Sequence, residues 1–138
     1  MNIEIRYLSK SGNTKKVADA IADALDLTPK PITEAVGADT DVLFLGGAVY
    51  GFGIDEALKT FIRNLPNVKI VAVFSTTAVV KSAFPHIKSV LDEKAIPVAG
   101  AEFHCRGAFS ILHKGRPNAT DLKRAGEFAR DIVATYGK

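Results

Sequence analysis

The sequence lacks the features that mark secreted, disulfide-bonded and membrane-spanning proteins. It has one cysteine, Cys105, among 138 residues, so it can form neither an internal disulfide nor a metal site of four cysteines. Its longest apolar run, residues 43–54, is shorter than the roughly 18 residues that a membrane helix needs. The first residues have neither the basic nor the apolar region of a signal peptide. We therefore expect a soluble, cytoplasmic protein that has no membrane partner.

Acidic residues are missing from one segment of a mildly basic chain. The net charge is +3 and the isoelectric point is about 9.0. No Asp or Glu occurs from His104 to Asn118, whereas Arg106, Lys114 and Arg116 do. This segment can attract anions, although a basic loop exposed to water is the simpler interpretation. No signature of a nucleic-acid-binding module accompanies these residues, so we expect no nucleic-acid partner.

Apolar residues follow strand-like and helix-like patterns in alternation along the chain. The expected strands cover residues 3–8, 28–32, 42–45, 68–74 and 96–105, and the expected helices cover 13–25, 54–65, 83–94 and 122–136. This alternation predicts a three-layer α/β/α fold around a doubly wound, five-stranded parallel sheet. Right-handed crossovers make the strand order reverse at one point, where ligands bind. No repeat or linker divides the chain, so we expect one domain over residues 1–138.

The most informative segment, residues 8–14, joins the first expected strand to the first expected helix. Gly12 lets the backbone approach a ligand closely, and three residues bring hydroxyl groups: Ser9, Ser11 and Thr14. Together with the amide groups at the start of the helix, these residues can bind a phosphate monoester. The alternative is that Ser11 and Asn13 only cap the helix. One cap, however, accounts for one polar residue and not for four around a glycine.

Other phosphate-binding and signalling patterns are absent. The chain has no Gly-x-x-x-x-Gly-Lys-Ser/Thr motif, and no Gly-x-Gly-x-x-Gly follows the first strand. That strand ends in Leu8-Ser9, where the receiver domains of two-component signalling need acidic residues, so phospho-acceptor signalling is excluded. The three histidines lack the short spacing of a local zinc motif, and we expect no metal site.

Residues 9–14, Ser-Lys-Ser-Gly-Asn-Thr, resemble the phosphate loop of flavodoxins, whose usual form is Thr/Ser-x-Thr-Gly-Asn-Thr. The resemblance extends along the chain in length and element order, and it implies a short-chain flavodoxin-like protein that is unusually basic. In that family the strands are ordered 2-1-3-4-5, and FMN binds where the order reverses. The resemblance implies that FMN is the cofactor and that one loop holds its phosphate through Ser9, Lys10, Ser11, Gly12, Asn13 and Thr14.

The segment after the third expected strand combines aromatic residues with glycines. The resemblance places it against one face of the flavin ring, with contacts from Ala48, Val49, Tyr50, Gly51, Phe52 and Gly53. Tyr50 or Phe52 can stack on the ring. Gly51 or Gly53 can permit the peptide rotation that accompanies flavin reduction in the family. The alternative is that the two aromatic residues only cover the edge of the sheet.

The loop after the fourth expected strand lacks the aromatic residue that flavodoxins commonly present there. Its implied contacts to the flavin are Ser75, Thr76, Thr77, Ala78 and Val79. The two threonines can hydrogen-bond the polar edge of the ring, and Val79 offers a weaker apolar contact. An ordinary Ser/Thr turn is an equally good interpretation of this segment.

Cys105 and Arg106 end the fifth expected strand, at the same edge of the sheet as the three loops. A neighbouring guanidinium group can lower the pKa of a thiol and make it reactive. A small, buried and inert cysteine is the simpler interpretation. We assign no catalytic residue.

Several functions are compatible with these residues. The first is an FMN-binding redox protein that transfers electrons between non-covalently bound FMN and a redox partner protein or a small electron acceptor. It would be an electron carrier rather than a stand-alone enzyme. The second is an NAD(P)H- or quinone-type reductase of flavodoxin fold, which the basic charge suits because positive charge stabilises reduced, anionic flavin. The third is a non-redox binding or regulatory module that retains the fold.

Overall fold

Five parallel strands form the centre of the fold in the computed structural model, which describes residues 1–50, 53–109 and 112–137, Tyr50 by its backbone alone. The parallel strands are β1 (Ile3–Tyr7), β2 (Lys30–Pro31), β3 (Val42–Tyr50), β5 (Ile70–Thr77) and β6 (Phe103–Arg106). They lie in the order β2-β1-β3-β5-β6, and β4 (Gly53–Ile54) pairs antiparallel with the end of β3. The expected order 2-1-3-4-5 is confirmed, because β5 and β6 are the fourth and fifth parallel strands along the chain.

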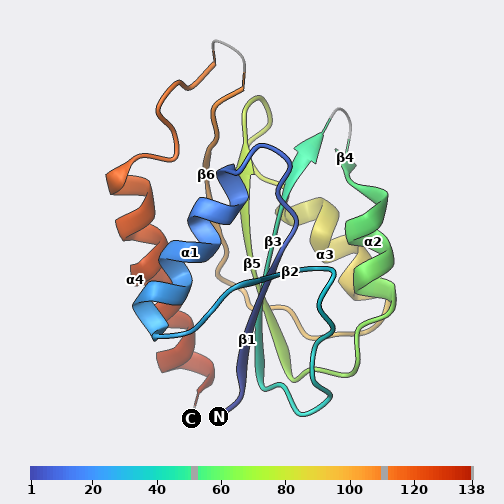
Figure 1. Cartoon of the computed structure of the whole chain (residues 1–138). Helices are drawn as coiled ribbons and strands as arrows, with labels where there is room; N and C mark the ends of the chain where they lie inside the picture. Colours follow the sequence, from blue (N-terminus) through green and yellow to red (C-terminus); the bar gives the residue numbers. More distant parts are fainter. Residues whose placement is uncertain (51–52, 110–111, 138) are drawn as a thin grey trace.

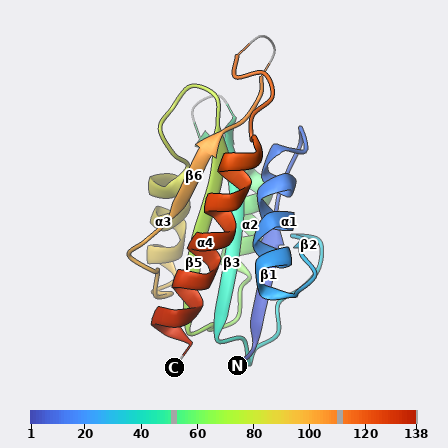
Figure 2. The same cartoon turned by 90° about the vertical axis from the view of Figure 1, so that its left-hand side faces the viewer.

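Four helices cover the two faces of this sheet. Helices α1 (Asn13–Leu25) and α4 (Ala119–Tyr136) lie on one face, and α2 (Glu56–Arg63) and α3 (Phe84–Glu93) lie on the other (Figure 1). Seen from the side in Figure 2, α1 and α4 run next to each other in front of the strands. Gly126 makes this approach close, since a Cβ atom there would lie 3.3 Å from the Cβ of Ala24. The expected three-layer α/β/α fold is confirmed.

Strand β3 shows why the buried strands read as continuous apolar runs. Val42 and Phe44 pack into the core beneath α1 and α4, whereas Leu43 and Leu45 pack into the core beneath α2 and α3. Successive side chains of a strand point to opposite faces, and here both faces are covered. All four side chains are fully buried.

Two strands are longer than the sequence predicted. Strand β3 continues to Tyr50 and β5 continues to Thr77, although loops were expected to begin at Gly46 and Ser75. The prediction failed at Gly46 and Gly47 because these glycines serve packing and not a turn. A Cβ atom would overlap the ring of Phe74 at Gly46 and would lie 2.5 Å from the side chain of Leu58 at Gly47.

Two other boundaries also differ from expectation. Strand β6 begins at Phe103 and not at Ile96, and the earlier part of the expected strand makes only an isolated bridge between Val98 and Val71. Helix α4 begins at Ala119 and not at residue 122, and it is capped by Asn118, with Asp121 completing a capping box. The Asn118 side chain accepts the Asp121 N–H and the Asp121 carboxylate accepts the Asn118 N–H, so the cap is reciprocal.

The two ends of the chain lie close together, below the amino ends of the strands in Figure 1. The connection from β6 to α4 rises at the opposite end, above the carboxyl ends of the strands (Figures 1 and 2). No helix within the described ranges is long and apolar enough to cross a membrane. The single domain and the cytoplasmic location stay predictions.

Candidate functional site

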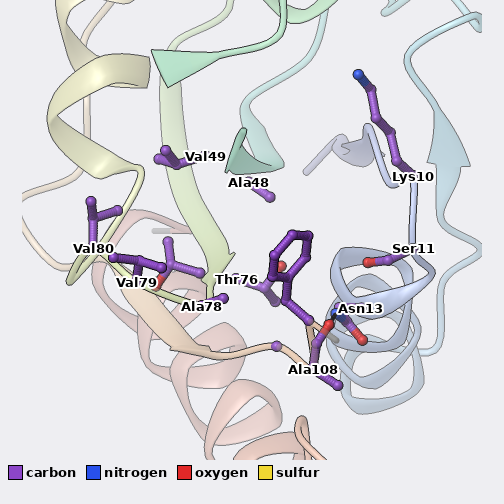
Figure 3. A pocket seen from close by; sticks show the side chains of 13 residues that line it. Lys10, Ser11, Asn13, Ala48, Val49, Thr76, Ala78, Val79, Val80 and Ala108 are labelled. Carbon is purple, nitrogen blue, oxygen red and sulfur yellow. Dashed lines mark hydrogen bonds between the residues drawn. The ribbon is translucent and has the colours of Figure 1, made fainter. Parts of the chain in front are cut away.

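A cavity of about 670 Å³ opens at the carboxyl edge of the sheet, where the strand order reverses. Its walls come from the loop after β1, the end of β3, the end of β5 with the loop that follows, and the chain after β6. The lining residues are Lys10, Ser11, Asn13, Ala48, Val49, Thr76, Thr77, Ala78, Val79, Val80, Gly107, Ala108 and Phe109. In Figure 3, Lys10, Ser11 and Asn13 lie on one side, and Val79 and Val80 lie on the opposite side. The volume falls within the range of about 300–1,000 Å³ typical of small-molecule sites.

The first loop leaves the start of α1 open to a ligand. Gly12 adopts φ +91°, a conformation that favours glycine, and its N–H donates to Ser9 Oγ at 3.1 Å. No side chain of the described residues caps the helix, so the alternative in which Ser11 or Asn13 caps it is wrong. The first N–H groups of a helix have no partner within the helix. Here they and the exposed Ser11 border the cavity, which makes this end of the helix suited to an anion.

Two other polar residues of the first loop hold neighbouring segments together. The Asn13 side chain donates from Nδ2 to the carbonyl oxygen of Ala108 at 3.0 Å, and Thr14 Oγ1 lies 2.8 Å from Thr76 Oγ1. A Cβ atom at Gly107 would lie 2.7 Å from Asn13 Nδ2, so the two segments are in close contact. Asn13 therefore ties α1 to the chain after β6, and the buried Thr14–Thr76 pair ties α1 to β5.

Lys10 connects the first loop to α2. Its ammonium group lies 2.7 Å from a carboxylate oxygen of Asp55, the N-cap residue of α2. The hydrogen bond from Lys10, together with that from the Ala57 N–H, lowers the pKa of Asp55 from its ordinary value. The charge of Lys10 thus lines the cavity while it is balanced by a carboxylate that stays ionised at neutral pH.

The loop after β5 is held by one side chain from the end of β6 and one from the chain that follows. Arg106, the last residue of β6, donates from Nη1 to the carbonyl oxygen of Val80 at 2.9 Å. His113 Nε2 lies 3.0 Å from the carbonyl oxygen of Ala78. Between them Val79 is 77% exposed, and its neighbour Val80 is also exposed. The loop therefore presents apolar side chains at the mouth of the cavity while its backbone is tied to its neighbours.

Sequence reasoning missed the contribution of the chain after β6. Gly107, Ala108 and Phe109 line the cavity. Val80, in the loop after β5, also lines it and was likewise not predicted. The signal was present, because Gly107 directly follows the fifth parallel strand and the carboxyl ends of parallel strands share one edge. Phe109 is an aromatic residue that is 66% exposed, and it borders a cavity whose third loop has no aromatic residue.

The other expected site residues either do not line the cavity or lie outside the described residues. Four lie close by without lining the cavity: Ser9, Gly12, Thr14 and Ser75. Ser75 is fully buried, and its Oγ accepts the N–H of Ala83 at the start of α3. Gly53 lies in β4. The side chain of Tyr50, with Gly51 and Phe52, lies outside the described residues, so the expected stacking and peptide rotation stay predictions.

Cys105 is an inert core residue. It is 7% exposed, and burial, followed by the nearby charge of Asp121, raises the pKa of its thiol to about 12. The suggestion that Arg106 activates the thiol is wrong, since the Arg106 guanidinium group binds the Val80 carbonyl oxygen instead. The simpler interpretation, a buried cysteine that stays protonated, is confirmed.

The arrangement around the cavity agrees with what a family comparison finds. The sequence model of a family described as "Flavodoxin domain" matches residues 4–116. The chain belongs to the flavodoxin family. Flavodoxins generally bind FMN, and the matched range includes every described residue that lines the cavity of this flavodoxin.

Individual relatives and solved structures support the same fold. An uncharacterized protein of Methanocaldococcus jannaschii is 28% identical over 140 residues, covering 88% of this chain and 90% of its own. A flavodoxin from the domain Archaea superposes with a TM-score of 0.81 at 20% identity, covering all of both chains. A short-chain flavodoxin associated with a bacterial microcompartment gives a TM-score of 0.76 at 20% identity, covering 99% of each chain. At these identities the solved structures show the shared fold alone.

Proposed function

We propose that this chain binds FMN non-covalently in the cavity at the carboxyl edge of the sheet and transfers electrons through it. The observation that carries the proposal is the uncapped start of α1 beside a largely apolar cavity of about 670 Å³. A phosphate group needs the first of these features, and a flat conjugated ring needs the second. FMN, when bound, supplies the transfer of one or two electrons, and the residues of the chain bind and orient it.

The first loop is proposed to hold the phosphate. The N–H groups at the start of α1 and the exposed hydroxyl of Ser11 are free to donate toward the cavity, and Gly12 keeps the backbone clear of a side chain. Lys10 adds a positive charge that Asp55 keeps in place. Asn13 and Thr14 support the phosphate site indirectly, because their side chains already bind Ala108 and Thr76 and thereby fix the conformation of the loop.

The ring is proposed to lie between β3 and the loop after β5. Ala48 and Val49 line one part of the cavity, and Val79 and Val80 line another. Phe109 lines it from the chain after β6. We propose that this residue supplies the aromatic contact that the third loop of this chain lacks, because aromatic rings pack well in offset stacks.

The positive net charge of the chain favours electron acceptors that suit a higher midpoint potential of the flavin. Positive charge near the ring stabilises reduced, anionic flavin, and the net charge is +3. This supports a quinone-type or other small acceptor as an alternative to a redox partner protein. The reductase alternative rests on this charge alone.

The proposal is tested by titrating flavin-free protein with FMN and with riboflavin in phosphate-free buffer, followed by flavin fluorescence. We expect the fluorescence of FMN to be quenched at a much lower protein concentration than that of riboflavin, because only FMN carries the phosphate that the first loop would bind. Equal quenching of both would contradict the placement of the phosphate. No binding of either would leave a flavodoxin fold that serves as a binding module.

A further inference from the structure

A second, smaller hollow of about 210 Å³ lies against β6, the edge strand of the sheet. Four cationic side chains line it: Lys81 from the loop after β5, Arg106 from β6, Arg116 from the connection that follows, and Arg124 from α4. Asp121 is the one carboxylate among its described lining residues. These residues come from separate segments of the chain, so the charge does not belong to the solvated face of one helix.

The carboxylate in this hollow is fully engaged by other groups. Asp121 accepts hydrogen bonds from Arg116, from Nε at 2.6 Å and from Nη2 at 2.8 Å, and from the N–H of Asn118 at 2.9 Å. Burial acts to raise the pKa of Asp121, but the bonds from Arg116 and Asn118 outweigh it and lower the pKa. Asp121 therefore pairs with Arg116, and its charge also acts on Arg124 without forming a salt bridge to it. The other three cations are thus left outside any salt bridge of the described residues.

Those three cations are Lys81, Arg106 and Arg124. Over the ranges that the structure describes, none of them has a carboxylate within salt-bridge distance. Arg106 donates one N–H to the Val80 carbonyl oxygen, and a guanidinium group has five N–H donors. Like charges that share one hollow repel each other, and an anion placed between them removes that repulsion.

Two further side chains, Cys105 and His104, border the same hollow. The thiol of Cys105 stays protonated at neutral pH, because its pKa is raised to about 12. His104 Nδ1 lies 2.7 Å from Glu102 Oε1, and Glu102 Oε2 accepts a hydrogen bond from Ser82 Oγ at 3.3 Å. Glu102 is therefore a carboxylate near the hollow, but it is not among the described residues that line it.

We propose that this hollow is a binding site for a small phosphate anion, separate from the cavity assigned to FMN. The hollow has about a third of the volume of the larger cavity, a size that suits an orthophosphate or diphosphate group. Guanidinium and ammonium groups are the side chains best suited to phosphate oxygens. The site shares no lining residue with the larger cavity.

The test is a titration of the flavin-free, full-length protein with pyrophosphate, and separately with orthophosphate, at constant ionic strength, followed by amide NMR. Saturable shifts are expected at residues 103–106, which lie outside the larger cavity and so report on this hollow even if the first loop also binds the anion. The double variant Lys81→Ala/Arg124→Ala should bind roughly tenfold more weakly, because two exposed charge contacts are lost. Tighter binding of one of the two anions identifies which of them the site fits.

Lys123→Ala is the matched control, since Lys123 is an exposed neighbour of Arg124 on α4 that does not line the hollow. It removes one positive charge and should leave the affinity within about twofold of the parent. The proposal is overturned by the absence of saturable shifts at residues 103–106 or by equal affinity in the double variant. Equal chemical-shift changes on addition of sodium chloride would also overturn the proposal, because the changes would then reflect ionic strength and not phosphate binding.

Discussion

The larger cavity and the basic hollow lie along the same stretch of sheet edge, yet they present positive charge in different ways. In the cavity, the N–H groups at the start of α1 are offered by the backbone, and Lys10 is balanced by Asp55. In the hollow, Lys81, Arg106 and Arg124 offer side-chain charges that no described carboxylate holds in a salt bridge. The first arrangement depends on one local conformation at Gly12. The second depends on three elements meeting in space.

One short segment separates the two sites. Val79 and Val80 line the cavity, and the next residue, Lys81, lines the hollow. Arg106 lines the hollow and binds the carbonyl oxygen of Val80. A ligand in either site therefore contacts a segment that also borders the other site. Substitutions in either site can accordingly test how the two sites differ.

The largest expected effect comes from removing the internal carboxylate of the hollow. Asp121→Asn should lower the free energy of unfolding at pH 7 by about 2 kcal/mol, because it breaks a partly buried, bidentate pair with Arg116 and weakens the α4 cap. Urea denaturation measures this. Since the pKa of Asp121 is lowered in the folded protein, its stabilisation is full above the unfolded value of about 3.9 and is lost as the pH falls through the folded value. The difference between parent and variant should therefore shrink by pH 3.

Asp131→Asn is the control for that prediction, because it makes the same change at an exposed position of the same helix. It should alter the free energy of unfolding by less than about 0.5 kcal/mol. Similar losses in both variants would mean that the Arg116–Asp121 pair does not build the wall of the hollow.

The next effect concerns the apolar wall of the cavity. Phe109→Ala should raise the dissociation constant of FMN roughly tenfold, because the aromatic contact proposed for the ring is lost. Fluorescence titration measures it. Leu112→Ala is the control, since Leu112 pairs with the backbone of Phe109 but is not among the described residues that line the cavity. If both variants bind FMN as the parent does, Phe109 is not a wall of the flavin site.

The smallest effect connects the two sites through charge. Arg106→Glu should lower the midpoint potential of bound flavin by about 10–40 mV, the one-electron equivalent of about 0.2–1 kcal/mol for exposed charges. The shift should diminish as salt is added. Arg130→Glu, an exposed position that lines neither site, should leave the potential unchanged. An equal shift in both variants would show that only the net charge of the molecule matters.

Sequence patterns predicted the elements whose signals are local. Helix α1 begins and ends where its apolar spacing predicted, at Asn13 and Leu25, and the buried runs at 42–45 and 68–74 gave the central strands. The end of β3 could not be predicted, because Gly46 looks like a turn residue until Phe74 is known to fill the space of its Cβ. The length of a strand is set by its neighbours, which a single sequence does not show.

The sequence by itself determined the flavodoxin fold and predicted a phosphate loop, because hydrophobic periodicity and the Ser-Lys-Ser-Gly-Asn-Thr segment are local properties of the chain. Only the tertiary structure decided which side chains share a wall. It brought Phe109 to a cavity whose own loop lacks an aromatic residue, and it gathered Lys81, Arg106 and Arg124 around one hollow. These groups lie up to 43 positions apart along the chain, and the parallel sheet joins them because all its strands end at one edge.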